Sequence, residues 1–195
     1  MAKKIFIACD TSNIALTEKI IKDTQTKNLK IGYKFGLEFF YSKKGRAFIS
    51  TIKNQSIFLD LKLNDIPNTC VSAIKSLKDL KNIEFLTVHI NGGIDMIKAV
   101  KKNSKKINKK IKIIGVTVLT SFSESSIRKI GYNRSIKDLV YKQIKLAKSA
   151  KLDGIVCSGH EVKYIKNICK KMEIITPGIR LIGDKIQDQK RVMSP

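Results

Sequence analysis

The sequence predicts an α/β protein built as a TIM-type (β/α)₈ barrel, with seven of the eight strands encoded. Two observations predict this fold. Short apolar runs alternate with amphipathic helical patterns along the chain, which is typical of a parallel sheet covered by helices. Polar residues also recur at the carboxyl ends of the strand candidates, where a barrel builds its active site. These residues are Asp10, Lys34, Asp60, Lys62, His89, Thr120 and Ser158.

Seven apolar runs are the strand candidates. In chain order they are residues 5–9, 30–34, 56–62, 85–89, 111–119, 154–158 and 173–176. Each is short and almost continuously apolar, as expected of parallel strands buried on both faces. The apolar run in the N-terminal stretch MAKKIFIACD is too short for a signal peptide, so we interpret it as the first strand.

Six amphipathic segments between these runs are the helix candidates. They are residues 15–26, 36–52, 69–80, 93–103, 136–150 and 161–171. In the third, Val71, Ile74, Leu77 and Leu80 recur at helical spacing. No linker or internal repeat divides the pattern, so we expect residues 1–195 to form one barrel domain that is incomplete at its C-terminal end.

A doubly wound sheet is the competing α/β layout. That fold normally places a glycine-rich turn after its first strand, whereas this chain has ACDTSN there. Neither a G-x-G-x-x-G nor a Walker A sequence is present, which favours the barrel.

Composition excludes several classes of protein. Of the 195 residues 43% are hydrophobic, as in an ordinary globular domain, and no stretch approaches eighteen consecutive apolar residues, so we expect no membrane span. The four cysteines are scattered, without a C-x-x-C pair or a histidine at metal-ligand spacing. We therefore expect a cytoplasmic protein with reduced cysteines and no metal site.

The net charge is unusually basic. The chain has 39 basic and 16 acidic residues, for a formal charge of +23, which can indicate a nucleic-acid partner. Nearly all of the excess is lysine, however, and the densest run, residues 101–112, has no aromatic residue for stacking on bases. We expect lysine-covered solvated faces and no nucleic-acid partner, although the charge would attract small anions.

The stretch FLDLKLNDIPNT, residues 58–69, places charges inside an apolar strand. Because side chains alternate along a strand, Asp60 and Lys62 should point to the same face. Buried charges are costly unless they are paired. Taken alone, the motif is better explained by a structural ion pair at a strand end.

Five motifs together are more specific. ACD, YKFG, DLKLNDIPNT, VTVLTS and TPGIR…DQKRV occur in this order and span almost the whole chain. The sequence resembles the orotidine 5′-phosphate decarboxylase family, although D-x-K-x-x-D alone is shared by related phosphate-binding barrel decarboxylases and aldolases. The resemblance implies conversion of orotidine 5′-phosphate to UMP in de novo pyrimidine biosynthesis, without a metal or organic cofactor.

The resemblance also implies the catalytic residues. Lys62 would stabilise the negative charge that develops at C6 of the pyrimidine and donate a proton there. Asp60 would lie near the substrate carboxylate and disfavour it in the bound state. Lys34 and Asp65 would complete an alternating array of lysine and aspartate, so that each charge has an opposite neighbour.

A symmetric homodimer is implied as well. In the family, the second aspartate of the motif and the threonine that closes IPNT reach the neighbouring subunit's site. Carried over, Asp65, Ile66 and Thr69 would serve the partner's active site.

The remaining implied roles concern substrate binding. Asp10 and Lys34 would bind the ribose hydroxyls, and Thr120 would contact the pyrimidine edge. In the loop of residues 177–189, Gln189 would bridge toward the phosphate and Arg180 would order the closed loop.

Several of these residues also have purely structural interpretations. Asp10 could cap the following helix, and Arg180 could be an ordinary surface residue. His89 could be a hydrogen-bonded barrel residue, and His160 could simply begin a helix.

The chain departs from the family pattern at its end. It stops at KRVMSP, and we find neither an eighth strand nor the Gly-Arg pair whose arginine binds the phosphate in the family. Arg191 lies too early to replace that arginine. We therefore expect an open barrel with an incomplete phosphate site and weak activity.

Two other functions remain open from the residues alone. One is a sister barrel enzyme that acts on a sugar-phosphate acid. The other is a basic nucleotide- or nucleic-acid-binding protein without catalysis, whose affinity would fall steeply with salt.

Overall fold

Seven parallel strands form one curled sheet in the computed structural model, which describes residues 4–180 and 190–194. The strands are β1 (Lys4–Ala8), β2 (Lys30–Gly36), β3 (Ser56–Leu63), β4 (Ile83–His89), β5 (Lys112–Val116), β6 (Gly154–Val156) and β7 (Glu173–Ile175). Each strand pairs with its neighbour in the sequence. The barrel-type α/β fold predicted from the sequence is therefore confirmed.

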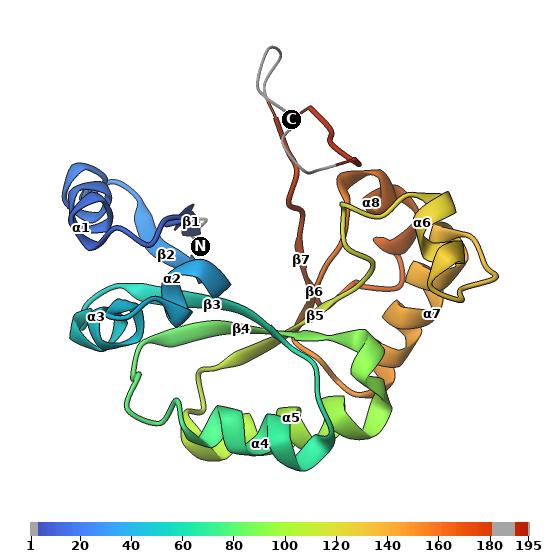
Figure 1. Cartoon of the computed structure of the whole chain (residues 1–195), viewed down its shortest axis with the longest axis horizontal. Helices are drawn as coiled ribbons and strands as arrows, with labels where there is room; N and C mark the ends of the chain where they lie inside the picture. Colours follow the sequence, from blue (N-terminus) through green and yellow to red (C-terminus); the bar gives the residue numbers. More distant parts are fainter. Residues whose placement is uncertain (1–3, 181–189, 195) are drawn as a thin grey trace.

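The helices lie along the outer side of the curled sheet (Figure 1). They are α1 (Ile14–Asp23), α2 (Leu37–Tyr41), α3 (Gly45–Thr51), α4 (Pro67–Lys75), the 3₁₀ turn η1 (Ile90–Gly92), α5 (Gly93–Ile107), α6 (Glu124–Lys129), α7 (Ile136–Ser149) and α8 (Gly159–Ile165). Among the described residues β1 and β7 are the two edges of the sheet, with no ladder joining them. Because all seven strands are parallel, their carboxyl ends meet at one rim of the sheet.

The prediction of one continuous helix over residues 36–52 is wrong. The segment is divided into α2 and α3, and the Ser42 hydroxyl donates to the carbonyl of Phe39 at the break, at 2.8 Å. The chain turns back so closely that a Cβ on Gly45 would lie 1.7 Å from the Phe39 carbonyl oxygen. Only glycine permits this approach, and a helical pattern does not reveal it.

Other boundaries differ because tighter turns replace regular hydrogen bonds. Helix α4 ends at Lys75, short of the predicted residue 80, and Leu77 and Leu80 continue in turns with N–H···O distances of 3.0 Å. Helix α8 ends at Ile165 instead of residue 171. Strand β5 ends at Val116, short of residue 119, where its three-residue partner β6 also ends. Helix α6 was not predicted.

The first helix is capped by Asn13, whose side-chain oxygen accepts from the Leu16 amide at 3.1 Å. The alternative structural interpretation of Asp10 as this cap is therefore wrong. His160 does lie at the start of α8, where its ring Nε2 contacts the Val192 carbonyl at 2.9 Å.

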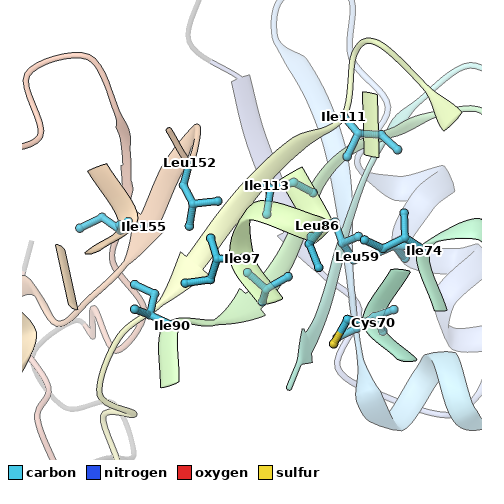
Figure 2. Close-up of a cluster of buried hydrophobic side chains, with 14 of the residues drawn as sticks. Leu59, Cys70, Ile74, Leu86, Ile90, Ile97, Ile111, Ile113, Leu152 and Ile155 are labelled. Carbon is cyan, nitrogen blue, oxygen red and sulfur yellow. The ribbon is translucent and has the colours of Figure 1, made fainter. Parts of the chain in front are cut away.

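The main core lies between the sheet and its helices (Figure 2). Leu59, Leu86 and Ile113 extend from three adjacent strands toward Ile74 of α4 and Ile97 of α5, and all five side chains are fully buried. Because these residues come from strands β3 to β5, the core supports the part of the sheet that carries the charged motif.

A second, smaller apolar cluster fills the inner side of the sheet. The ring centroids of Phe58 and Phe85 are 5.5 Å apart with their planes at 83°, and Phe6 lies 5.7 Å from Phe58. Such edge-to-face contacts favour aromatic rings beyond their buried area. The cluster forms a floor beneath the carboxyl ends of the strands.

In the described part of the chain, we find no helix with the length and apolar character needed to cross a membrane.

The outer core yields a stability prediction. Replacing fully buried Leu86 with alanine should lower the free energy of unfolding by about 2–5 kcal/mol, because the packed core cannot close the cavity. Urea denaturation monitored by circular dichroism measures this loss. Leu16, which is 45% exposed on α1, provides the control, and its alanine variant should change stability by less than about 0.5 kcal/mol. Equal losses for the two variants would contradict this account of the core.

Candidate active site

A cavity of about 530 Å³ opens at the carboxyl ends of the strands. Its floor is apolar and includes Phe6, Phe58, Val116, Val156 and Ile175. Its charged and polar lining residues are Asp10, Lys34, Asp60, Lys62, Thr120, Ser121, Thr176 and Arg180. A concave apolar site with a few convergent polar groups is suited to binding a small molecule. The structure thus brings together six of the predicted site residues, which are Asp10, Lys34, Asp60, Lys62, Thr120 and Arg180.

Asp60 and Lys62 form an ion pair at the edge of this cavity. The Lys62 ammonium donates to Asp60 Oδ2 at 2.8 Å, and the side chains are 30% and 17% exposed for Lys62 and Asp60. As alternation predicted, Leu59 and Leu61 on the same strand are buried in the outer core. Both charges line the cavity, and each neutralises the other where access to water is restricted.

Strand β3 is irregular at this pair. Leu59 is in register with Leu86 of β4 and Leu63 with Val88, so three residues of β3 lie opposite the single residue Thr87. Lys62 also has a φ of 49°, in the left-handed region that a lysine rarely adopts. A bulge of this kind redirects side chains and is frequent beside active sites.

Thr87 bridges the two ends of the bulge. Its hydroxyl donates to Asp60 Oδ1 at 2.9 Å and accepts from the Lys62 backbone N–H at 2.9 Å. The side chain is fully buried. Both carboxylate oxygens of Asp60 are therefore held, one by Thr87 and the other by the Lys62 ammonium.

The second charged pair differs from the predicted array. Lys34 donates to Asp10 Oδ1 at 2.8 Å, so within the chain its partner is Asp10 and not Asp60. Asp65 makes no ion pair with the other site residues among the residues described, and its Oδ1 accepts from the Ile66 amide at 2.7 Å. The turn into α4 carries Asp65 away from Lys62. Because the array implied by the resemblance takes its Asp65 from the neighbouring subunit, a single chain does not test it, and the array stays a prediction.

Asp65, Ile66 and Thr69 lie outside the cavity at the start of α4. All three are exposed, and Ile66 is 68% exposed. Most of the apolar surface of Ile66 is therefore not covered by its own chain. The roles implied for these residues in a neighbouring subunit stay predictions.

The far rim of the cavity is formed by residues at the carboxyl ends of β5, β6 and β7, and the segment at residues 190–194 is hydrogen-bonded to this rim. Thr120 lines the rim, and its backbone carbonyl accepts from the Lys190 amide at 3.1 Å. The Arg180 amide donates to the Met193 carbonyl at 2.9 Å, so residues 178–180 pair with this segment. Gln189, predicted to contact the phosphate, lies outside the described residues.

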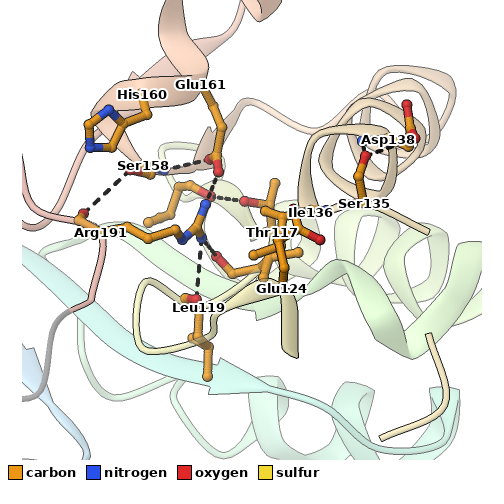
Figure 3. Close-up of polar contacts among 12 residues, drawn as sticks. Thr117, Leu119, Glu124, Ser135, Ile136, Asp138, Ser158, His160, Glu161 and Arg191 are labelled. Carbon is orange, nitrogen blue, oxygen red and sulfur yellow. Dashed lines mark hydrogen bonds and ion pairs between the residues drawn. The ribbon is translucent and has the colours of Figure 1, made fainter. Parts of the chain in front are cut away.

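Arg191 has a structural position that the sequence did not reveal (Figure 3). Its guanidinium pairs with Glu161 of α8 and donates to the carbonyls of Val118 and Leu119 at 2.9 and 3.2 Å. Glu161, only 2% exposed, also accepts from the Ser158 amide at 2.7 Å. This network joins the segment after β5, the start of α8 and residues 190–194 at the cavity wall.

His89 faces a different, smaller cavity of about 200 Å³, which it shares with Asn64, Asn91 and Thr117. Burial, followed by the nearby Lys62 ammonium, lowers the pKa of its imidazole. Its Nδ1 is buried and makes no hydrogen bond with a described residue. His89 does not line the main cavity, and its Nδ1 lacks the hydrogen bond expected of a hydrogen-bonded barrel residue.

The cysteine thiols are unsuited to nucleophilic catalysis. Burial raises the pKa of Cys9 to about 11 and that of Cys157 to about 12. Both thiols are therefore protonated near neutral pH, whereas the thiolate is the reactive form.

Comparison with known proteins shows the family. A model described as the orotidine 5′-phosphate decarboxylase / HUMPS family matches residues 3–195. The chain belongs to this family. The orotidine 5′-phosphate decarboxylase of Carboxydothermus hydrogenoformans is 40% identical over 202 residues, covering 100% of this chain and 82% of the relative. That of Buchnera aphidicola is 41% identical over 196 residues, covering 98% and 81%.

Solved structures agree with this membership. The orotidine 5′-phosphate decarboxylase of Lactobacillus acidophilus matches with a TM-score of 0.81 at 34% identity, covering 91% of this chain and 82% of that one. An orotidine 5′-monophosphate decarboxylase of Methanocaldococcus jannaschii, complexed with the inhibitor BMP, matches with a TM-score of 0.74 at 30% identity, covering 96% and 83%. The resemblance drawn from the five motifs is confirmed.

Thr87, Glu161 and Arg191 are the site-supporting residues that the motifs did not identify. Thr87 stands as one polar residue in the apolar run FLTVH, a signal that was available but ambiguous. Glu161 and Arg191 are 30 positions apart, so nothing local in the sequence indicates their contact. Within residues 4–180 and 190–194, no three His, Cys, Asp or Glu side chains gather as possible metal ligands. The expected absence of a metal or organic cofactor stays a prediction.

The lowered pKa of His89 yields a pH prediction. In the unfolded chain a histidine titrates near about 6.5, so below that pH the unfolded state binds a proton that the folded state resists. The contribution of neutral His89 is thus complete above about pH 6.5 and is lost as the pH falls toward the lower folded pKa. Urea denaturation from pH 7.5 to 5 should show a smaller acid-side loss of stability for His89→Gln than for the wild type. Parallel curves would contradict the burial of a neutral imidazole.

Proposed function

We propose that this chain decarboxylates orotidine 5′-phosphate to UMP in pyrimidine biosynthesis. The observation that carries the proposal is the Asp60–Lys62 pair, held on a bulge at the edge of an apolar-floored cavity. The relatives named above are orotidine 5′-phosphate decarboxylases, and the matching family model spans nearly the whole chain. A sugar-phosphate acid as substrate and a non-catalytic nucleic-acid-binding role are not favoured.

In this mechanism the charges of Lys62 and Asp60 promote cleavage of the bond that joins the carboxylate to the pyrimidine ring. The bond between C6 and the carboxylate carbon breaks, CO₂ leaves, and the electron pair stays on C6. The Lys62 ammonium stabilises that charge and transfers a proton to C6, which produces UMP, and the amine regains a proton from solvent. Asp60 lies against the substrate carboxylate and repels it, an interaction that disappears as CO₂ forms.

The remaining lining residues bind the rest of the nucleotide. We assign the ribose hydroxyls to Asp10 and Lys34, whose ion pair lies at the cavity edge, and the pyrimidine edge to Thr120. Gln189 bridges toward the phosphate, and Arg180, on the same rim, orders the loop that closes over the substrate. Binding energy gained at the phosphate end helps the reaction because it holds the pyrimidine against the charged pair.

We further propose a homodimer in which Asp65, Ile66 and Thr69 enter the neighbouring active site. Their exposure at the start of α4 supports this assignment, since each side chain is available for a contact outside its own chain. Asp65 would then approach a lysine of the partner's site and supply the charge that the array lacks within one chain. The four free, buried cysteines fit the reducing cytoplasm as the location.

The activity is tested with the 195-residue chain. Orotidine 5′-phosphate should be converted to UMP with a loss of absorbance, and Lys62→Ala should lower kcat by at least about a thousandfold because the charge at C6 loses its counter-ion and proton donor. Lys98→Ala, on α5 and away from the cavity, is the matched control and should retain wild-type kcat. Turnover that survives Lys62→Ala would overturn the role of Lys62. A wild-type chain that neither binds nor turns over the nucleotide would overturn the function.

The dimer is tested by mixing two inactive variants, Asp65→Ala and Lys62→Ala. Random subunit exchange makes half of the dimers hybrids, and one of the two sites in each hybrid contains both wild-type groups. About a quarter of the wild-type site activity should therefore return. Subunit exchange is verified by mass spectrometry of differently tagged chains. Exchange without recovered activity would mean that each chain supplies its own Asp65.

A further inference from the structure

The bulge in β3 leaves two polar groups without the partners that a regular strand would give them. The Lys62 N–H has left the ladder, because three residues of β3 lie opposite one residue of β4. The Asp60 carboxylate is largely buried and has one oxygen turned away from the Lys62 ammonium. A buried donor or acceptor without a hydrogen bond is costly.

The Thr87 hydroxyl provides a hydrogen bond to both groups, the Lys62 N–H and the second carboxylate oxygen of Asp60. A carboxylate accepts only, so the hydroxyl must donate to Asp60 Oδ1, which leaves its lone pairs to accept from the Lys62 N–H. The two distances are each 2.9 Å, and Thr87 is fully buried, so water does not compete. The β-branched side chain is also stiff at χ1, which fixes where the hydroxyl lies.

We propose that Thr87 is a positioning residue that holds Asp60 and Lys62 in their reacting geometry. The inference rests on the proposed decarboxylation and names no new contact with the substrate. Asp60 must stay beside the substrate carboxylate although the two charges repel each other. A lone aspartate would rotate away from the incoming charge, whereas the Thr87 hydrogen bond holds its second oxygen in place.

The same hydroxyl also supports the backbone of Lys62. The left-handed φ of 49° is strained for a lysine, and such a conformation persists only where the surroundings hold it. The hydrogen bond from the Lys62 N–H to Thr87 supplies that support from the neighbouring strand. Loss of the hydroxyl should therefore displace the ammonium from C6 as well as loosen Asp60.

The test compares Thr87→Val with the wild type. Valine has nearly the same shape but no hydroxyl, and a misplacement of about 1 Å can cost about a hundredfold in rate. We expect kcat for orotidine 5′-phosphate to fall at least about tenfold. KM should change less than about threefold, since the phosphate and ribose contacts lie elsewhere in the cavity. Thr87→Ser, which keeps the hydroxyl, should restore most of kcat.

Thr117→Val is the matched control. Thr117 is also buried, and its hydroxyl donates to the Val156 carbonyl at 2.9 Å without contacting Asp60 or Lys62. Its valine variant should keep kcat within about threefold while losing a comparable buried hydrogen bond. If Thr87→Val does not fold, Thr87→Ser and Thr87→Ala make the same comparison, because they also differ by one hydroxyl.

Amide hydrogen exchange gives a readout that does not depend on activity. In Thr87→Val the Lys62 amide should exchange at least about tenfold faster, while the amides of Leu59 and Leu86 keep their protection. Unchanged exchange at Lys62, or a kcat loss no larger than that of Thr117→Val, would overturn the positioning role. A wild-type chain without turnover would instead contradict the proposed decarboxylation, and the exchange experiment would still decide whether Thr87 holds Lys62.

Discussion

The constraint on which this site depends is the pairing of Asp60 with Lys62 on one irregular strand. Two opposite charges about 4 Å apart attract by about 4 kcal/mol at the effective dielectric near a protein surface, and the cost of removing them from water offsets much of this gain. Removing either partner would leave the other charge without its counter-ion in the cavity wall. The strained φ of Lys62 adds about 1–3 kcal/mol of cost. The surrounding sheet must therefore hold a local arrangement that is unfavourable by itself.

The sheet can hold this charged pair because one face of β3 packs in the core while the other lines the cavity. Leu59 and Leu61 pack toward the helices in the outer core, while Phe58 belongs to the aromatic floor and Asp60 lines the cavity. Period-two alternation thus separates stability from chemistry along one strand. The bulge interrupts the register with β4 only after Leu59, at the rim, while the alternation continues through Leu61 in the core and Lys62 in the cavity.

Much of this organisation could be predicted from residues close in sequence. The parallel strands follow from short apolar runs, and the common face of Asp60 and Lys62 follows from their spacing. Local patterns fail at close backbone approaches and where the chain meets distant segments. The close approach of Gly45 to Phe39 breaks a helix that looks continuous. Asp10 takes Lys34 as its partner because β1 lies beside β2, and Arg191 reaches Glu161 because residues 190–194 lie against the start of α8.

The two polar networks at the rim also differ in how much chain they enclose. The bond from Thr87 to Asp60 spans 27 positions, whereas those from Arg191 to Val118 and Leu119 span 73 and 72. Closing a longer loop costs more chain entropy. The network that positions the reacting groups is therefore local to two consecutive strands, whereas the network of the opposite wall joins segments far apart in the chain and carries the larger entropy cost.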